Sequence, residues 1–254
     1  MTAPTERRGR SEAAIWQDVE FGNYGADLAL WIELADRIGD PVLELGAGAG
    51  RVALELAARG HRMLAVEDDE TLVAELQRSV ERRSVDISIV RHDLSSPADL
   101  HLPAKARLSI GPLHVIQMLD RTARPALLRR LGEVLAPGAT IALTVVDEGT
   151  LLSEGTAAPQ ILPDMRELDG WVYSSEPLWV QVSDEVLSVR RIRERVSPEG
   201  RMERSVHDDV LYRVTAERLE QEAESVGLLR AGRRRITYGP NDADSTVVLL
   251  EVPS

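Results

Sequence analysis

The chain has 254 residues, 43% of them hydrophobic, and its 42 acidic and 30 basic side chains give a formal charge of −12. This length suits one large α/β domain with an elaborated insertion. The acidic balance argues against a broad nucleic-acid surface, because binding phosphates needs a clustered positive field. Cysteine is absent, which excludes disulfides, thiolate nucleophiles and cysteine-bound zinc. A small molecule is therefore the expected partner.

The N-terminal residues and the longest apolar runs indicate where in the cell the protein is expected. Residues 1–10 are polar and lack the apolar core of a signal peptide, and no run approaches the length needed to cross a bilayer. We therefore expect a cytoplasmic protein without a membrane contact. No spacing of histidines and carboxylates matches a metal site, so no metal is expected. The chain is compatible with a homodimer.

The N-terminal segment, residues 11–34, is predicted to be mostly helical, with a break at residues 22–25. A buried strand follows at residues 41–45, then a turn with alternating glycines and a helix over residues 51–59. Glycine accepts positive φ and has no Cβ, so this backbone can bend tightly and lie against a ligand. The unpaired amides at the helix start favour a negative group at the same point.

The spacing of this loop narrows the choice of ligand. A dinucleotide fingerprint needs a glycine where Arg51 stands, which disfavours nicotinamide and flavin cofactors. No Lys-Ser or Lys-Thr pair follows the loop, so a nucleoside triphosphate site is disfavoured more strongly.

The next two strands each end near a carboxylate. Residues 60–67 form a second strand that ends on Glu67, where a carboxylate at the strand tip can accept both hydroxyl hydrogens of a ribose. Alternatively, the acidic run 67–70 only begins the next helix. Residues 85–90 form a third strand, closed by a turn that contains Asp93, for which an ordinary capping role is the alternative.

The second half of the chain supplies the rest of the predicted elements. A fourth strand at residues 106–112, a helix from about residue 121 or 125 and a fifth strand at 140–147 continue the pattern. Residues 171–212 then alternate with period two, as in an antiparallel sheet with a hairpin turn at 198–200. Thr215 caps a helix that Gly227 ends, and strands at 228–238 and 246–252 close the main sheet, with a turn between them.

The segment Glu44-Leu45-Gly46-Ala47-Gly48-Ala49-Gly50 resembles the first motif of the class I S-adenosylmethionine-dependent methyltransferases, an acidic residue followed by Gly-x-Gly-x-Gly. The Leu-x-Pro-Gly turn at 135–138 and the inserted antiparallel sheet resemble further features of the small-molecule members. The fourth strand departs from the family, because it begins with Ala106-Arg107 where many members have an aspartate.

The resemblance implies an α/β fold with a Rossmann-like seven-stranded, mostly parallel sheet and helices on both faces. A helical N-terminal cap and an antiparallel β lid inserted after the fifth strand complete it. The expected organisation is one domain with four parts: the cap at 1–40, the cofactor-binding core at 41–150, the β lid at 151–213, and the C-terminal helix and last strands at 214–254.

The implied activity is methyl transfer from S-adenosylmethionine, with S-adenosylhomocysteine as product. The acceptor would be nitrogen or oxygen of a small-molecule metabolite, such as a natural product or a sugar-like compound. One alternative is a cyclase-like enzyme that uses S-adenosylmethionine structurally. Another is a binding or regulatory protein, for which an eroded glycine loop would be expected.

The resemblance also assigns cofactor contacts. Glu67 would bind the ribose, Asp93 the adenine amino group with Leu94 beside the ring, and the loop the methionine end. Tyr24 or Trp16 from the N-terminal segment could cover the sulfonium or the substrate, unless they are core aromatics. The remaining expected cofactor-binding residues are Glu44, Gly46, Ala47, Gly48, Gly50, Arg51, Asp68 and Gly111.

Two histidines are candidates for catalysis, because an imidazole suits general-base work near neutral pH. His114 lies just past the fourth strand, beside the expected transfer point, and a pocket-wall role is its alternative. His207 lies in the predicted lid, whose strands would roof the substrate. His61 and His101 are expected at the surface, and His92 near the adenine pocket.

Overall fold

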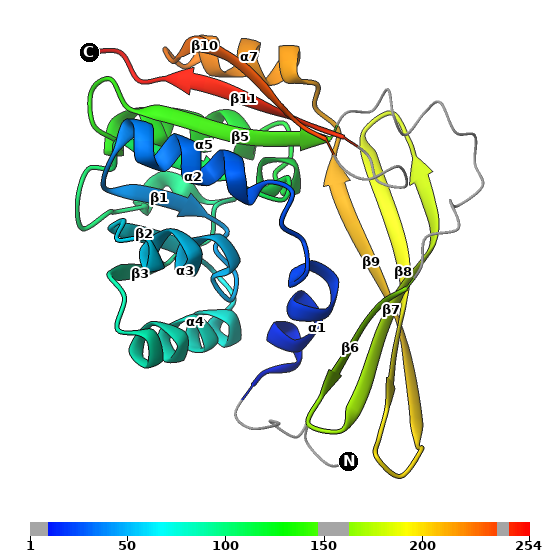
Figure 1. Ribbon diagram of the computed structural model, residues 1–254. Coiled ribbons are helices and arrows are strands. Elements are labelled where there is room, and N and C mark those ends of the chain that lie inside the picture. Colours follow the sequence, from blue (N-terminus) through cyan, green and yellow to red (C-terminus); the bar gives the residue numbers. More distant parts are fainter. Residues whose placement is uncertain (1–9, 147–162, 238–243) are drawn as a thin grey trace.

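The computed structural model describes residues 10–146, 163–237 and 244–254 (Figure 1). It contains two sheets, which we call the main sheet, of seven strands, and the second sheet, of four. Among the described residues, no helix combines the length and the apolar character that crossing a membrane requires. Location and assembly stay predictions.

The main sheet has the order β10-β11-β5-β4-β1-β2-β3. Neighbouring strands pair in parallel except β11, which runs antiparallel to both β5 and β10. The expected seven-stranded, mostly parallel sheet is therefore confirmed. The strands are β1 (Val42–Leu45), β2 (Met63–Glu67), β3 (Ile87–Arg91), β4 (Leu108–Gly111), β5 (Thr140–Val146), β10 (Leu229–Ile236) and β11 (Ser245–Glu251).

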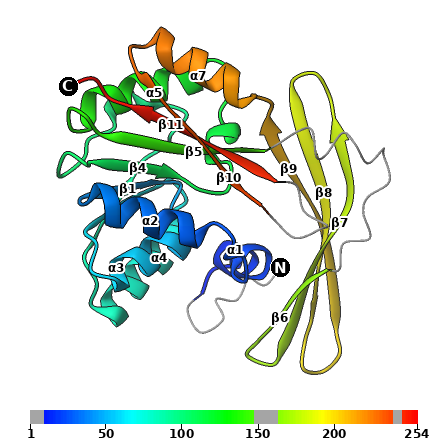
Figure 2. The ribbon, with the colours of Figure 1, turned by 45° about the horizontal axis from the view of Figure 1, so that its top comes forward.

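Helices cover both faces of the main sheet (Figure 2), and its central strands β1, β2 and β4 are therefore buried on both sides. One face packs against α2, α3 and α4, and the other against α5 and α7. Two short 3-10 turns, η1 and η2, follow β3 and β4. The bounds are α2 (Leu28–Ile38), α3 (Arg51–Ala58), α4 (Glu70–Arg83), η1 (Pro97–Asp99), η2 (Val115–Met118), α5 (Ala123–Val134) and α7 (Ala216–Ser225).

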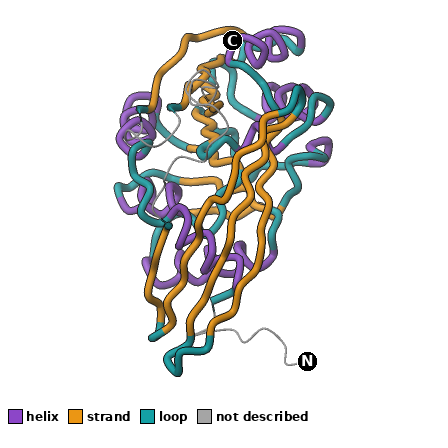
Figure 3. The backbone as a smooth tube through the Cα atoms, turned by 90° about the vertical axis from the view of Figure 1, so that its right-hand side faces the viewer, coloured by secondary structure: helices purple, strands orange, loops and turns teal. Residues whose placement is uncertain are grey.

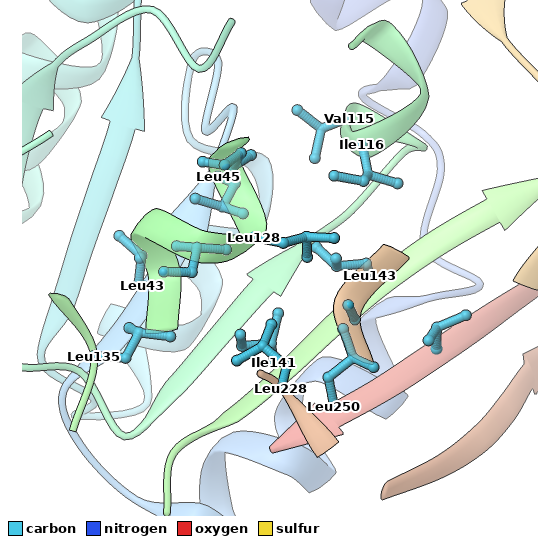
Figure 4. Close-up of a cluster of buried hydrophobic side chains, with 14 of the residues drawn as sticks. Leu43, Leu45, Val115, Ile116, Leu128, Leu135, Ile141, Leu143, Leu228 and Leu250 are labelled. Atoms are coloured by element: carbon cyan, nitrogen blue, oxygen red, sulfur yellow. The ribbon is translucent and has the colours of Figure 1, made fainter. Parts of the chain in front are cut away.

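The larger core lies between the main sheet and the α5 and α7 layer (Figure 4). Leu43 and Leu45 of β1 meet Leu128 of α5 there, and all three are fully buried. Val115 and Ile116 of η2 belong to the same cluster. The turn after β4 is therefore anchored in the core, so the residues next to it have a defined position.

The second sheet is an antiparallel ribbon with the order β6-β7-β8-β9 (Figure 3). Its strands are β6 (Asp164–Leu168), β7 (Trp171–Val182), β8 (Val186–Val196) and β9 (Met202–Tyr212). The alternating pattern correctly predicts β7 to β9 but misses β6, a five-residue strand with three charged side chains. The pairing of β7 with β8 has a register shift between Pro177 and Trp179.

Helix α1 (Glu12–Phe21) lies between the two sheets (Figure 1). The ring of Trp16 meets that of Tyr173 on β7 edge to face, with centroids 5.5 Å apart. Glu20 is held by both Arg193, in a two-pronged pair at 2.7 Å, and the Ser175 hydroxyl at 2.7 Å. Trp16 therefore fastens α1 to the second sheet, as in the alternative in which it is a core aromatic.

A buried ion pair joins α5 to α7 and offers a test of this packing. Arg124 and Glu222 are 4% and 6% exposed and meet at 3.0 Å. Glu222→Ala should lower the free energy of unfolding by about 3 kcal/mol, because it leaves a buried guanidinium unpaired. Glu224→Ala on the exposed side of the same helix should change it by less than about 0.5 kcal/mol. Urea unfolding of the variants measures both, and equal effects would contradict the assignment.

Candidate functional site

The loop between β1 and α3 is built on the chain's own contacts. Gly46, Gly48 and Gly50 all have positive φ, at 65°, 57° and 94°. A Cβ on Gly46 would lie 2.7 Å from Val115, and one on Gly48 would overlap the side-chain amide of Gln17. Side chains are therefore excluded here both by backbone conformation and by close neighbours.

The amides of this loop already have acceptors. Ala47 donates to the Val66 carbonyl at 2.9 Å, which ties the loop to β2. Gly48 donates to Glu67 Oε2 at 2.7 Å, and Ala49 donates to Gln17 Oε1 at 2.6 Å. A ligand that approaches the loop therefore meets the side chains of Glu67 and Gln17 at these amides.

Glu44 lies at the carboxyl side of β1 and is 3% exposed. Burial raises the pKa of this carboxyl to about 8, against the opposing effects of Arg51 and of a hydrogen bond from the Ala53 amide. Glu44 thus supplies a negative group at the start of α3 when it is ionised. Its Oε2 has no hydrogen-bond partner among the described residues. Such an orphaned acceptor marks a place where a ligand donor can bind.

Arg51 ties the loop to the start of α2. Its guanidinium makes a two-pronged pair with Asp27 at 2.7 and 2.6 Å and lies 5.0 Å from the centroid of the Tyr24 ring. The Trp31 indole donates to the same carboxylate at 2.8 Å. Asp27 is not predictable as a site residue from the sequence, because no local pattern links it to Arg51. The Arg51 guanidinium therefore interacts with two carboxyl groups, those of Asp27 and Glu44.

Glu67 ends β2 as predicted and is 7% exposed. Besides the Gly48 amide, it accepts the amides of Asp68 and Asp69, both at 3.0 Å. Burial raises the pKa of Glu67, although these backbone donors oppose the shift. Asp68 is exposed, and Asp69 caps α4 through the Thr71 and Leu72 amides. Asp69 therefore begins the helix, as the alternative predicts, while Glu67 faces the glycine loop and its ribose role stays a prediction.

Asp93 and Leu94, the residues expected near adenine, follow β3, whereas the expected cofactor contact Gly111 ends β4, and β1 and β2 lie between these two strands. Asp93 is exposed and accepts the Ser95 amide and hydroxyl, both at 2.8 Å, so it shapes the turn as the capping alternative predicts. These hydrogen bonds lower the pKa of Asp93. Leu94 packs against the larger core. A Cβ on Gly111 would lie 2.7 Å from Leu143, so packing requires this glycine.

His114 occupies a strained position just after β4. Leu113 and His114 both have positive φ, at 49° and 61°, and such strain concentrates at functional sites. The His114 amide donates to Thr144 Oγ1 at 2.7 Å, and its Nε2 lies 2.7 Å from Ser245 Oγ. Burial lowers the pKa of His114 to about 4. The imidazole is therefore neutral at pH 7 and is a weak base.

His207 lies on β9 of the second sheet, 3.2 Å from Asp209. Asp209 also accepts from Arg191 at 3.1 Å. The His207 side chain is 43% exposed. The two histidine candidates therefore belong to different sheets, although β9 contacts η2, the turn that His114 precedes.

A cavity of about 510 Å³ lies beside the loop. Its walls include residues from β1, α1, the loop and the turn after β4, which are Gln17, Tyr24, Glu44, Gly46, Arg51 and Leu113. This volume is within the range of small-molecule sites. No group of three or more histidines and carboxylates in the described ranges is placed to hold a metal ion.

The chain has the Rossmann-like fold of the class I S-adenosylmethionine-dependent methyltransferases. Residues 42–138 match the model of a methyltransferase domain. The donor set fits the cofactor, because an orphaned buried carboxyl oxygen beside the loop can accept from an ammonium group and Glu67 stands at the strand tip.

Known proteins resemble the chain chiefly in fold. The sugar N-methyltransferase KedS8 from Streptoalloteichus sp ATCC 53650 has a TM-score of 0.73 at 14% identity, covering 98% of this chain and 96% of its own. CalS10, an amino pentose methyltransferase from Micromonospora echinaspora, has a TM-score of 0.67 at 13% identity, covering 92% and 96%. An S-adenosylmethionine-dependent methyltransferase from Clostridium acetobutylicum ATCC 824 has a TM-score of 0.71 at 14% identity, covering 95% and 98%.

A curated relative matches over a shorter stretch. The ribosomal RNA small subunit methyltransferase A of Anaeromyxobacter dehalogenans (strain 2CP-C) is 54% identical over 43 residues. These residues are 17% of this chain and only 15% of that protein.

The raised pKa of Glu44 predicts a pH-dependent stability of the free protein. The folded-state pKa of Glu44, about 8, exceeds the ordinary value of 4.5. The contribution of protonated Glu44 to the stability of the folded protein is therefore full below about pH 4.5 and is lost as the pH rises through 8. Wild type should therefore lose thermal stability from pH 6 to 9 relative to Glu44→Gln, which cannot ionise. Melting curves that shift in parallel for both proteins would contradict the assignment.

Proposed function

We propose that this protein transfers the methyl group of S-adenosylmethionine to a nitrogen of a small amine-bearing acceptor, such as an amino sugar. The observation that carries the proposal is the pair of buried carboxyls, Glu44 and Glu67, which flank the glycine loop of a methyltransferase domain. Glu44 with its unpartnered oxygen would receive the ammonium of the methionine end. Glu67 would receive the ribose hydroxyls, and Asp93 with Leu94 the adenine.

S-adenosylmethionine supplies an electrophilic methyl group when it is bound. The chain then has to hold the acceptor in line with that group and exclude water. The carboxyl ends of the parallel strands of the main sheet point toward one side of the molecule. Helix α1 and the second sheet cover that side (Figure 2). Their position supports this role.

The acceptor side of the proposal rests on the second sheet. His207, Asp209 and Arg191 form a linked polar group there, and Asp164 lies 3.7 Å from Arg191. Carboxylates attract an amine, and an imidazole held by a carboxylate can take the proton that the amine releases. We assign that proton to His207, and we assign His114 to the pocket wall because its low pKa makes it a poor base.

Two of the structural relatives support a nitrogen acceptor. KedS8 is described as a sugar N-methyltransferase and CalS10 as an amino pentose methyltransferase. The same arrangement of sheets would let this chain present a comparable amine to the donor.

Methyl transfer can be tested with amino sugars and with the matching sugars in which a hydroxyl replaces the amine. We expect S-adenosylhomocysteine and an acceptor heavier by one methylene unit only with the amines, as measured by mass spectrometry. Product from the hydroxyl series alone would overturn the nitrogen assignment. Cofactor binding without transfer to any acceptor in either series would favour the cyclase-like alternative.

The ribose role of Glu67 has its own test. Glu67→Ala should weaken binding of S-adenosylhomocysteine at least about tenfold in calorimetry, because two hydroxyl hydrogen bonds to a carboxylate are lost. Glu70→Ala is the matched control, since Glu70 belongs to the same acidic run but is exposed. Equal affinities for wild type and Glu67→Ala would show that Glu67 does not bind the ribose.

A further inference from the structure

Gln17 of α1 reaches into the cofactor loop from outside the main sheet. Its Oε1 accepts the Ala49 amide at 2.6 Å, although the two residues are 32 positions apart. The side-chain amide lies so close to Gly48 that a Cβ there would overlap it. Gln17 lies outside the glycine motif at residues 44–50, and that motif by itself does not predict a polar side chain from α1 at the loop.

The orientation of the Gln17 amide follows from its partner. Because Ala49 is a donor, the oxygen of the side chain must face it, and the two N–H donors of Nε2 lie on the other branch. Within the described ranges Nε2 makes no hydrogen bond, and Gln17 lines the cavity together with Glu44 and Arg51. The same cavity is therefore lined by a residue with a neutral donor pair, Gln17, and by Glu44, whose Oε2 has no hydrogen-bond partner among the described residues.

We propose that Gln17 is a positioning residue that donates from Nε2 to the carboxylate of the methionine end of bound S-adenosylmethionine. Together with Glu44, which would accept from the ammonium, it reads the amino-acid part of the cofactor. This inference deepens the proposed function and rests on it, because it names a contact of the same site. It extends the contacts that the glycine motif indicates to a residue of the N-terminal helix.

The position of α1 gives this contact a second consequence. Two other residues of α1 bind the helix to the second sheet, Glu20 through Arg193 and Asp18 through Arg166 at 2.6 Å. A cofactor held by Gln17 therefore also holds the helix on which the second sheet rests. Cofactor binding and placement of the second sheet are linked through one helix.

The test compares S-adenosylhomocysteine with 5′-methylthioadenosine, which keeps the adenosine but lacks the amino-acid part. Gln17→Ala should weaken S-adenosylhomocysteine binding about tenfold in calorimetry, the size of one charge-assisted hydrogen bond, and leave methylthioadenosine binding unchanged. Gln17→Glu keeps the acceptor for Ala49 but repels a carboxylate, so it should weaken S-adenosylhomocysteine binding further. It should also leave methylthioadenosine binding unchanged.

Glu20→Gln is the matched control, because it loosens α1 from the second sheet without altering a side chain that lines the cavity. If Glu20→Gln also weakened binding of S-adenosylhomocysteine but not of methylthioadenosine, Gln17 would act only by holding the helix. Equal losses for both ligands in Gln17→Ala would place the contact on the adenosine part, and unchanged affinities would remove it. All three results overturn the inference but leave the proposed function standing, whereas failure of the wild type to bind either ligand would overturn the proposed function itself.

Discussion

The hydrogen bond from the Gly48 amide to the Glu67 carboxylate joins the two strand ends on which the site depends. It fixes the glycine loop after β1 against the tip of β2 at a distance of 2.7 Å. The Ala47 amide adds a second link to β2 through Val66. Because the carboxylate is buried, the backbone amides that donate to it, from Gly48, Asp68 and Asp69, offset part of the cost of removing its charge from water. The loop is therefore preorganised before a ligand arrives, and a ribose would meet a carboxylate whose position is already set.

Charge is distributed around the loop in a way that suits a cationic ligand. Asp27 and Arg51 neutralise each other in a close pair, whereas Glu44 has an unpartnered oxygen and a raised pKa of about 8. An ammonium or sulfonium nearby would favour the ionised form of Glu44. The Glu44 carboxyl thus keeps its proton in the free protein and would lose it when a cation binds nearby. Cation binding and deprotonation of Glu44 are therefore coupled electrostatically.

The second sheet contributes to the site indirectly, through α1. Trp16 and Glu20 bind the helix to β7 and β8, and Gln17 meets the loop from the same helix. The second sheet is attached to α1 and also contacts η2, and its strand β9 carries exposed apolar residues such as Met202 and Val206. The main sheet carries the glycine loop, and the second sheet holds the helix that reaches this loop.

The sequence by itself determined the main sheet, the glycine loop and Glu67 at its strand end, because each depends on local periodicity and on short spacings. It also indicated most of the second sheet, but not β6, whose charged side chains hide the strand pattern. Only the tertiary structure decided that Asp27 pairs with Arg51 and Gln17 with Ala49, 24 and 32 positions apart. It likewise placed Trp16 against Tyr173 and lowered the pKa of His114 through burial. These features arise from how elements pack against each other, and side-chain partners distant in the chain leave no pattern in one sequence.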